Sequence, residues 1–232
     1  MRPNLKEEKK LWEKGYKKVA SLDEVGRGAL AGPVVAAAVA VAKLKIKNDP
    51  FDVTQGHPER SRTDEKLKII LKGIKDSKQL SPKKREEFYR LITECPYIEW
   101  GIGRVSEKII DKINIKNAAE LAMEKALGNL EKKVGRTNFL IIDGNRLKNR
   151  KLKTKNHKLI VKADEKVFSC AAASILAKVT RDNLMKEYHR KYPYYGFDRH
   201  KGYATARHLK ALRKHRSCII HRQSFRPVWS CG

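Results

Sequence analysis

The sequence predicts an α/β fold, because short β-branched segments alternate with helix-forming segments along most of the chain. A hydrophobic share of 41% in 232 residues is enough for one well-packed core and too high for a disordered chain. Three of the apolar segments end on an aspartate, the arrangement expected when parallel strands bring side chains to one edge of a sheet. These observations together carry the fold prediction.

The first third of the chain predicts one helix and two strands. Residues 4–18 mix Leu, Trp and Tyr with many Lys and Glu, and predict a basic helix. Residues 19–23 (VASLD) predict a strand that ends on acid, and residues 34–42 (VVAAAVAVA) predict a buried strand after a Gly/Pro turn. Residues 47–72 carry Pro, Gly and many charges, and predict an exposed loop insertion.

The rest of the chain continues the alternation of strands and helices. Residues 76–92 contain a helix start, where Ser81 is an N-cap candidate and Pro82 fits the first helical position. Residues 106–132 predict one long helix or two. Further strands are predicted at 97–105, 139–143 and 159–164, and further helices at 167–190 and near 203–215.

The charge of the chain predicts a polyanionic partner. The net charge is +27 and the isoelectric point is near 10.0, and neutralising phosphates releases condensed counterions. The same charge suits a non-catalytic basic nucleic-acid-binding protein, such as a ribosome-associated factor. We expect the basic tail at 191–232 to contact a duplex, with His208, Lys210, Arg213, Lys214 and Arg216 as candidate contacts.

No segment predicts a membrane span or export. The longest nearly apolar run, residues 29–42, is too short for a bilayer and contains Pro33. Residues 1–18 carry charges without the apolar stretch of a secretory signal. The four cysteines form no CxxC pair, so free thiols in a reducing compartment are expected. We therefore expect a cytoplasmic protein that does not bind membranes.

Asp23, Asp143 and Asp164 follow apolar segments and are candidates for one shared site. If the three strands lie parallel and adjacent, these acids meet at one sheet edge, and Glu24 can turn toward them where its strand ends. Clustered carboxylates repel one another unless a cation binds, and all-oxygen ligation favours Mg²⁺ or Mn²⁺. Two such ions suit phosphodiester hydrolysis. Each acid taken alone could also be a simple turn residue.

Several long motifs resemble the ribonuclease HII family, of the bacterial type within the RNase H-like superfamily. The resemblance covers about residues 11–92 and 117–228 and departs near the predicted insertion. The motifs, in the order of the family, are ASLDEVGRGALAGPVVAAAV at 20–39, DSKQLS at 76–81, LIIDGN at 140–145, KAD at 162–164, AAASILAKVTRD at 171–182, YGFDRHKGYATARHL at 195–209 and HRQSFRPV at 221–228.

The resemblance implies an RNase H-like domain at 19–190, with a central mixed β-sheet flanked by helices, and a small C-terminal helical region at 191–232. Residues 1–18 are then an N-terminal basic helical extension. The implied enzyme is an endoribonuclease that cuts the RNA strand of RNA–DNA hybrids and nicks duplex DNA 5′ of embedded ribonucleotides. Its products carry 3′-hydroxyl and 5′-phosphate ends, and its roles are ribonucleotide excision and RNA primer removal. A monomer is the default for the family.

The resemblance also implies the catalytic metal ligands, which are Asp23, Glu24, Asp143 and Asp164. Asp182 is a rival for the fourth position, and we interpret it as a structural acid. A transposase-like nuclease would share this acid chemistry but would act on pure DNA.

Sensing one ribonucleotide in DNA requires recognition of a single 2′-hydroxyl group. In the turn formed by Gly26, Arg27 and Gly28, the glycines permit close main-chain approach to a sugar, and the arginine can contact a phosphate. The resemblance implies that this turn holds the ribose and that Tyr203 stacks on the sugar of the DNA side.

A second group of candidates lies outside that turn. The resemblance places Ser77 and Lys78 on a phosphate-binding loop, and a lysine is a suitable point charge for phosphate. His200 is expected to form local hydrogen bonds and is given no chemistry.

Overall fold

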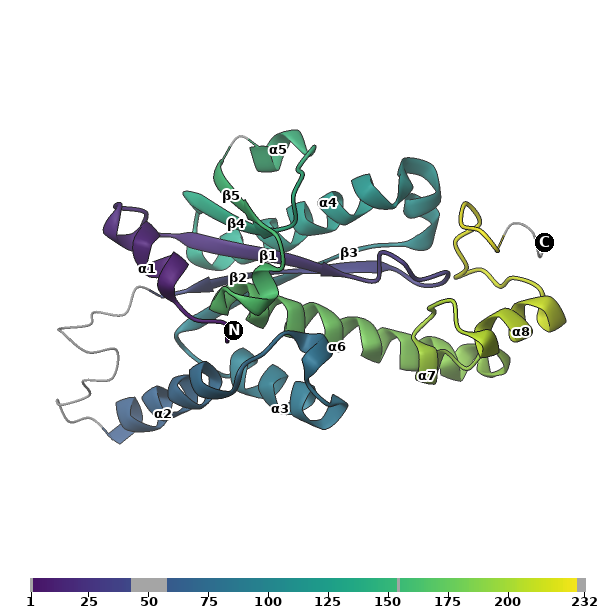
Figure 1. Cartoon of the computed structure of the whole chain (residues 1–232), viewed down its shortest axis with the longest axis horizontal. Coiled ribbons are helices and arrows are strands. Elements are labelled where there is room, and N and C mark those ends of the chain that lie inside the picture. Colours follow the sequence, from purple (N-terminus) through teal and green to yellow (C-terminus); the bar gives the residue numbers. More distant parts are fainter. Residues whose placement is uncertain (1, 43–57, 154, 229–232) are drawn as a thin grey trace.

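The computed structural model describes residues 2–42, 58–153 and 155–228 (Figure 1). Its strands are β1 (Val19–Val25), β2 (Val34–Val41), β3 (Ile98–Val105), β4 (Phe139–Asp143) and β5 (Asn156–Ile160). Its α-helices are α1 (Lys6–Glu13), α2 (Pro58–Gly73), α3 (Pro82–Thr93), α4 (Glu107–Val134), α5 (Arg150–Lys153), α6 (Phe168–Lys191), α7 (Phe197–His200) and α8 (Ala206–His215). The 3₁₀ turns are η1 (Ser77–Gln79), η2 (Ala163–Glu165) and η3 (Pro193–Tyr195).

The sheet is mixed and has the strand order β3-β2-β1-β4-β5. β1 pairs antiparallel with β2, which pairs antiparallel with β3. β1 pairs parallel with β4, and β4 pairs parallel with β5. The predicted mixed sheet is confirmed, and the strands β1, β4 and β5 lie parallel and adjacent. This places the carboxyl ends of β1 and β4 side by side.

Helices cover both faces of the sheet, with α4 on one face and α6 on the other (Figure 1). Alternate residues of β2 point to opposite faces, so Val35 and Ala37 pack toward α6 while Ala36 and Ala38 pack toward α4. A strand buried on both faces is apolar at every position, which explains the run VVAAAVAV. The small residues at the start of α6 are fully buried and bring that helix close to β1 and β2.

Several predicted boundaries agree with the structure. α3 begins at Pro82, and the hydroxyl of Ser81 caps it by accepting from the Lys84 amide at 3.3 Å. The long segment after β3 is α4, in which Asn114 adopts a φ of 62° and interrupts the helical backbone. The segment predicted as one long helix or two is therefore two helical stretches that meet at Asn114.

The predicted loop insertion at 47–72 is wrong over residues 58–72, which belong to α2. Leu67, Ile70 and Ile74 recur at helical spacing and are buried in the core beneath α6. Burial of this apolar face stabilises a helix, although charged residues dominate the segment. The remaining part of the prediction, residues 47–57, lies outside the described residues.

The predicted strand at 159–164 also differs from the structure. β5 ends at Ile160, and Lys162 adopts a left-handed conformation with a φ of 56°. This reversal ends the strand, so Asp164 lies in the 3₁₀ turn η2 directly before α6. The acid thus reaches the sheet edge from a turn and not from a strand.

The N-terminal helix packs against the domain. Leu11 and Trp12 are buried in the same core cluster as α6. The carboxylate of Glu8 is buried and accepts hydrogen bonds from both the amide and the hydroxyl of Ser169, at 2.9 and 2.6 Å. Because Ser169 lies in the first turn of α6, this carboxylate also faces the positive end of that helix.

The C-terminal region forms a third apolar cluster at the far end of α6 (Figure 1). Phe197, Leu212 and Ile220 pack there with Leu30 and Ala31, which follow β1. The predicted helix near 203–215 is α8.

Among the described helices, none has the length and apolar character needed to cross a bilayer. Cys170 and Cys218 are free thiols, and Cys231 lies outside the described residues.

Candidate active site

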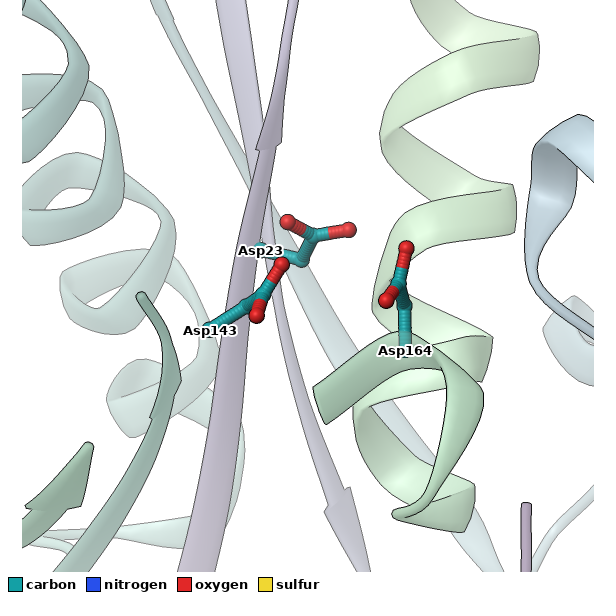
Figure 2. Close-up of side chains that lie close together, drawn as sticks. All are labelled: Asp23, Asp143 and Asp164. Carbon is teal, nitrogen blue, oxygen red and sulfur yellow. The ribbon is translucent and has the colours of Figure 1, made fainter. Parts of the chain in front are cut away.

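Three aspartates from separate elements meet at the carboxyl edge of the parallel strands (Figure 2). Asp23 belongs to β1, Asp143 ends β4 and Asp164 lies in η2. Each contributes one carboxylate oxygen to a group whose oxygens all lie within 4.8 Å of one another. Asp23 and Asp164 are buried, at 6% and 4% exposure. The predicted convergence of these three acids is therefore present in the fold.

Hydrogen bonds fix the relative positions of these side chains. Asp143 Oδ1 accepts from the Ala163 amide at 2.9 Å, which ties the end of β4 to the turn that carries Asp164. Asp23 Oδ1 accepts from the Glu24 amide at 2.8 Å. Backbone amides of β1 and η2 thus hold two of the three carboxylates in place.

Burial and mutual repulsion make this cluster costly to ionise. Burial, followed by the charges of Glu24, Asp143 and Asp164, raises the pKa of Asp23 well above its usual range. Burial, followed by the charges of Asp76 and Asp143, raises the pKa of Asp164 to about 6. A cation among the three carboxylates would remove this penalty. Their all-oxygen donor set fits a hard divalent ion such as Mg²⁺ or Mn²⁺.

Glu24, the fourth predicted ligand, makes a different contact. Its carboxylate forms an ion pair with Arg27 at 3.0 Å and is not a member of the three-aspartate group. Burial raises the pKa of Glu24, and the Arg27 charge opposes that rise. The structure therefore brings three of the four predicted acids together and leaves the fourth beside them, paired to the glycine-rich turn.

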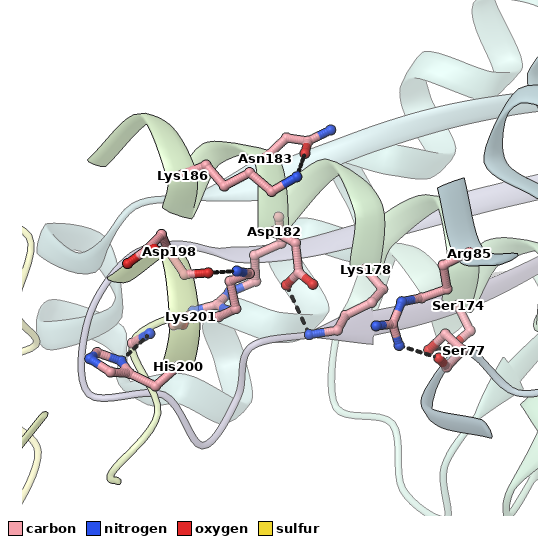
Figure 3. Close-up of polar contacts among 12 residues, drawn as sticks. Ser77, Arg85, Ser174, Lys178, Asp182, Asn183, Lys186, Asp198, His200 and Lys201 are labelled. Atoms are coloured by element: carbon pink, nitrogen blue, oxygen red, sulfur yellow. Dashed lines mark hydrogen bonds and ion pairs between the residues drawn. The ribbon is translucent and has the colours of Figure 1, made fainter. Parts of the chain in front are cut away.

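Asp182, the rival fourth ligand, lies apart from the cluster. It forms an ion pair with Lys178 at 2.8 Å, one helical turn away on α6 (Figure 3). The contact supports its interpretation as a structural acid.

The segment around Ser77 and Lys78 lies beside Asp164. The Ser77 hydroxyl is buried and hydrogen-bonds to the Ser174 hydroxyl of α6 at 2.8 Å (Figure 3). The exposed Lys78 ammonium lies 3.7 Å from the Asp164 carboxylate. The serine thus anchors the segment to α6, and the lysine is the member of this pair that is open to a phosphate.

The glycine-rich turn and Tyr203 are neighbours in space. Ala29, directly after the turn, forms an antiparallel bridge with Tyr203. Gly26 has a φ of +94°, a conformation that favours glycine, and a Cβ at that position would overlap the Arg181 guanidinium. That guanidinium also lies 5.4 Å from the centre of the Tyr203 ring. The glycine-rich turn and Tyr203, which are predicted to contact the sugar, therefore pack around the same arginine.

A model of the family described as Ribonuclease HII matches residues 61–229. The chain belongs to the ribonuclease HII family. Curated relatives named Ribonuclease HII include one from Chlamydia trachomatis serovar A, 42% identical over 93% of this chain and 85% of the relative. Another, from Acetivibrio thermocellus, is 44% identical over 94% of this chain and 73% of the relative. The crystal structure of the ribonuclease H2 from Pyrococcus horikoshii OT3 is similar with a TM-score of 0.66 and 26% identity, covering 92% of this chain and 96% of that one.

Membership of the ribonuclease HII family establishes the class of reaction. The chain is a metal-dependent hydrolase of the ribonuclease H type, and its family cleaves the RNA strand of RNA–DNA hybrids. Asp143 and Asp164 lie inside the matched residues, whereas Asp23 and the glycine-rich turn precede them. Because β1 pairs with β4, Asp23 nevertheless lies beside Asp143 in the ribonuclease HII site.

One predicted nucleic-acid contact of this ribonuclease is wrong. His208 is buried, because its ring lies between His200 and His221 in the C-terminal cluster. Burial lowers the pKa of His208 to about 4, so the ring is neutral at physiological pH. Of the predicted tail residues, Lys210, Arg213, Lys214 and Arg216 are exposed.

His200 forms the local hydrogen bonds that were expected. It contacts the Tyr195 carbonyl at 2.7 Å and accepts from the Gly202 amide at 3.2 Å. The contact with Gly202 supports the backbone directly before Tyr203.

Three polar residues near the site escaped the sequence analysis. Asp76 contributes to the raised pKa of Asp164, and its carboxylate caps η1 by accepting from the Lys78 amide. Arg181 and Arg222 are buried beneath the glycine-rich turn. Their presence in the motifs that carry the family resemblance was the signal that could have identified them. The motifs are DSKQLS, AKVTRD and HRQSFRPV.

Proposed function

We propose that this ribonuclease nicks duplex DNA on the 5′ side of an embedded ribonucleotide, as well as cutting the RNA strand of longer hybrids. The products would carry 3′-hydroxyl and 5′-phosphate ends, and the cellular roles would be ribonucleotide excision and RNA primer removal. The observation that carries the proposal is the bridge between Tyr203 and Ala29, the residue directly after the glycine-rich turn. The turn directly follows β1, which also supplies Asp23.

The aspartate cluster would hold two divalent ions, with Asp23, Asp143 and Asp164 as ligands and Glu24 completing the set. Such ions supply an activated water and charge stabilisation at the scissile phosphate. The protein's own contribution is position: the backbone donors that hold the carboxylates fix the site before substrate arrives. Lys78, exposed beside Asp164, would orient a non-bridging phosphate oxygen.

Recognition of the ribose would use the main chain of the glycine-rich turn. A Cβ at Gly28 would meet no other atom within 4 Å, so the backbone is open to an approaching sugar at this residue. Arg27 is half-exposed and can exchange its ion pair with Glu24 for a phosphate contact. Tyr203 would then pack against the neighbouring deoxyribose, where its ring leaves no room for a hydroxyl.

A nicking assay on a labelled duplex with one embedded ribonucleotide tests this function. We expect cleavage on the 5′ side of the ribonucleotide with Mg²⁺ or Mn²⁺, and none with EDTA or on the all-DNA duplex of the same sequence. Cleavage of long hybrids without nicking of the single-ribonucleotide duplex would reject the proposal and leave the family activity intact. Cleavage of the all-DNA duplex would reject the ribose-recognition argument.

A further inference from the structure

Two buried arginines beneath the glycine-rich turn are neither metal ligands nor substrate contacts in the proposed function. Arg181 of α6 and Arg222 of the C-terminal segment are both 0% exposed, which is rare for arginine unless it is paired. Within the described part of the chain, neither guanidinium forms an ion pair with a carboxylate. Backbone carbonyl oxygens take that place, so the two buried charges are compensated by peptide dipoles.

Arg222 binds three carbonyls of the loop between β1 and β2. Its Nη2 donates to Gly26 at 2.7 Å, its Nη1 donates to Arg27 at 2.9 Å and its Nε donates to Gly32 at 3.0 Å. The Arg222 amide also donates to the Leu30 carbonyl at 2.8 Å. Arg222, a single residue of the C-terminal segment, thus binds carbonyls at both ends of this loop.

Arg181 joins the same loop to the segment that carries Tyr203. Its Nε donates to Pro33 at 2.9 Å, its Nη2 donates to Ala31 at 3.1 Å and its Nη1 donates to Lys201 at 2.9 Å. Five of the six carbonyls bound by the two guanidiniums therefore belong to residues 26–33. The planar, five-donor geometry of arginine makes this possible, whereas a lysine ammonium presents its donors from a single point.

These contacts determine how the turn presents its backbone. In a trans peptide the carbonyl and the following amide point in opposite directions. Because the carbonyls of Gly26 and Arg27 are drawn toward Arg222, the amides of Arg27 and Gly28 are directed away from it. Those amides are donors of the kind that a ribose hydroxyl can accept.

We propose that Arg222, with Arg181 as its partner, is a positioning residue that shapes the loop at 26–33 for recognition of the ribose. The inference rests on the proposed function, because it assigns a task within ribose recognition. It also gives the C-terminal segment a part in substrate choice that is separate from phosphate contacts made by exposed basic residues.

Three measurements on Arg222→Met and Arg222→Lys test the proposal. They are kcat/KM for nicking the single-ribonucleotide duplex, the affinity for Mn²⁺ alone and the affinity for the all-DNA duplex. We expect kcat/KM to fall about a hundredfold in both variants, as for a small misplacement of a recognition element. Mn²⁺ affinity and all-DNA affinity should stay at wild-type values. Arg222→Lys keeps the charge but not the planar donors, so it should not rescue nicking.

Arg213→Met is the matched control, because it removes one exposed arginine of the same C-terminal region. It should weaken binding to both duplexes by one common factor. Because Arg222→Met leaves three buried carbonyls without a donor, Arg222→Lys and Arg181→Lys carry the test if that variant does not fold.

Nicking within threefold of wild type by Arg222→Lys or Arg222→Met would overturn the inference, as would a parallel loss of Mn²⁺ affinity. Failure of the wild type to nick the single-ribonucleotide duplex would instead reject the proposed function itself.

Discussion

Burial and neighbouring charges raise the pKa of Asp164, and the metal affinity of the site should therefore depend on pH. Its pKa is about 6, raised by burial and by the charges of Asp76 and Asp143. An ordinary aspartate has a pKa of 3.8, so between these two values this carboxyl still holds a proton that others have lost. A metal ion must displace that proton, and metal affinity therefore falls as the pH falls through about 6.

We predict that Mn²⁺ affinity falls at least about tenfold between pH 7 and pH 5. Calorimetric titration of the protein with Mn²⁺ at several pH values measures this. Asp76→Asn removes one repelling charge and keeps an oxygen that can cap η1, so it should move the fall to lower pH. An affinity that stays flat down to pH 5 would contradict this picture of the cluster.

At the scale of elements, the C-terminal region depends on a buried pair of histidines. His208 Nε2 and His221 Nε2 lie 3.1 Å apart. His208 Nδ1 contacts the Tyr203 carbonyl at 2.9 Å, and the Cys218 amide donates to His221 Nδ1 at 2.9 Å. Because a carbonyl only accepts and an amide only donates, His221 Nε2 donates to His208 Nε2 when both rings are neutral. The chain of bonds joins α8, the segment at 218–221 and Tyr203.

Protonation of this pair should destabilise the protein. Burial lowers the pKa of each ring from 6.5 to about 4, so the unfolded chain binds more protons than the folded one between these values. Stability is therefore full above pH 6.5 and falls as the pH drops toward 4. The loss between pH 7 and pH 5 is about 2 kcal/mol for each histidine.

Urea unfolding at pH 7 and pH 5 checks this prediction in the wild type and in His221→Gln. The variant should lose less stability than the wild type over the same range, although its starting stability is lower. The comparison between variants is needed because Asp23 and Asp164 have raised pKa values and change stability in the opposite direction. His215→Gln, at an exposed position on α8, is the control. Equal losses of stability between pH 7 and pH 5 in the wild type and in His221→Gln would show that folding does not lower the pKa of His221.

Elements with strong local signals could be predicted, and those that depend on distant partners could not. The strands that carry Asp23 and Asp143 were visible because apolar runs precede these acids, although β1 continues past Asp23 to Val25. The turn that carries Asp164 depends on the left-handed Lys162, which has no sequence signature. The ion pair of Glu24 with Arg27 and the contacts of Arg222, nearly two hundred residues from the loop it binds, arise only from the three-dimensional fold.

At the scale of the whole molecule, a small acidic site stands within a strongly basic protein. The chain carries a net charge of +27, yet three aspartates gather at one sheet edge. The exposed basic residues of α8 lie in the C-terminal region at the far end of α6 (Figure 1). The basic surface attracts a nucleic-acid backbone, and the acidic site accumulates cations.

Single-turnover cleavage by Asp143→Asn tests the central claim, that the aspartate cluster carries the chemistry. The substrate is a labelled RNA–DNA hybrid with Mg²⁺, and Asp182→Asn is the matched control, since Asp182 lies outside the cluster. Loss of groups that merely orient metal ligands already costs about 10- to 100-fold, so loss of a ligand should cost at least about a hundredfold. We predict that loss for Asp143→Asn, with hybrid binding and folding retained, and near wild-type cleavage for Asp182→Asn. Cleavage at the wild-type rate by Asp143→Asn would contradict the account.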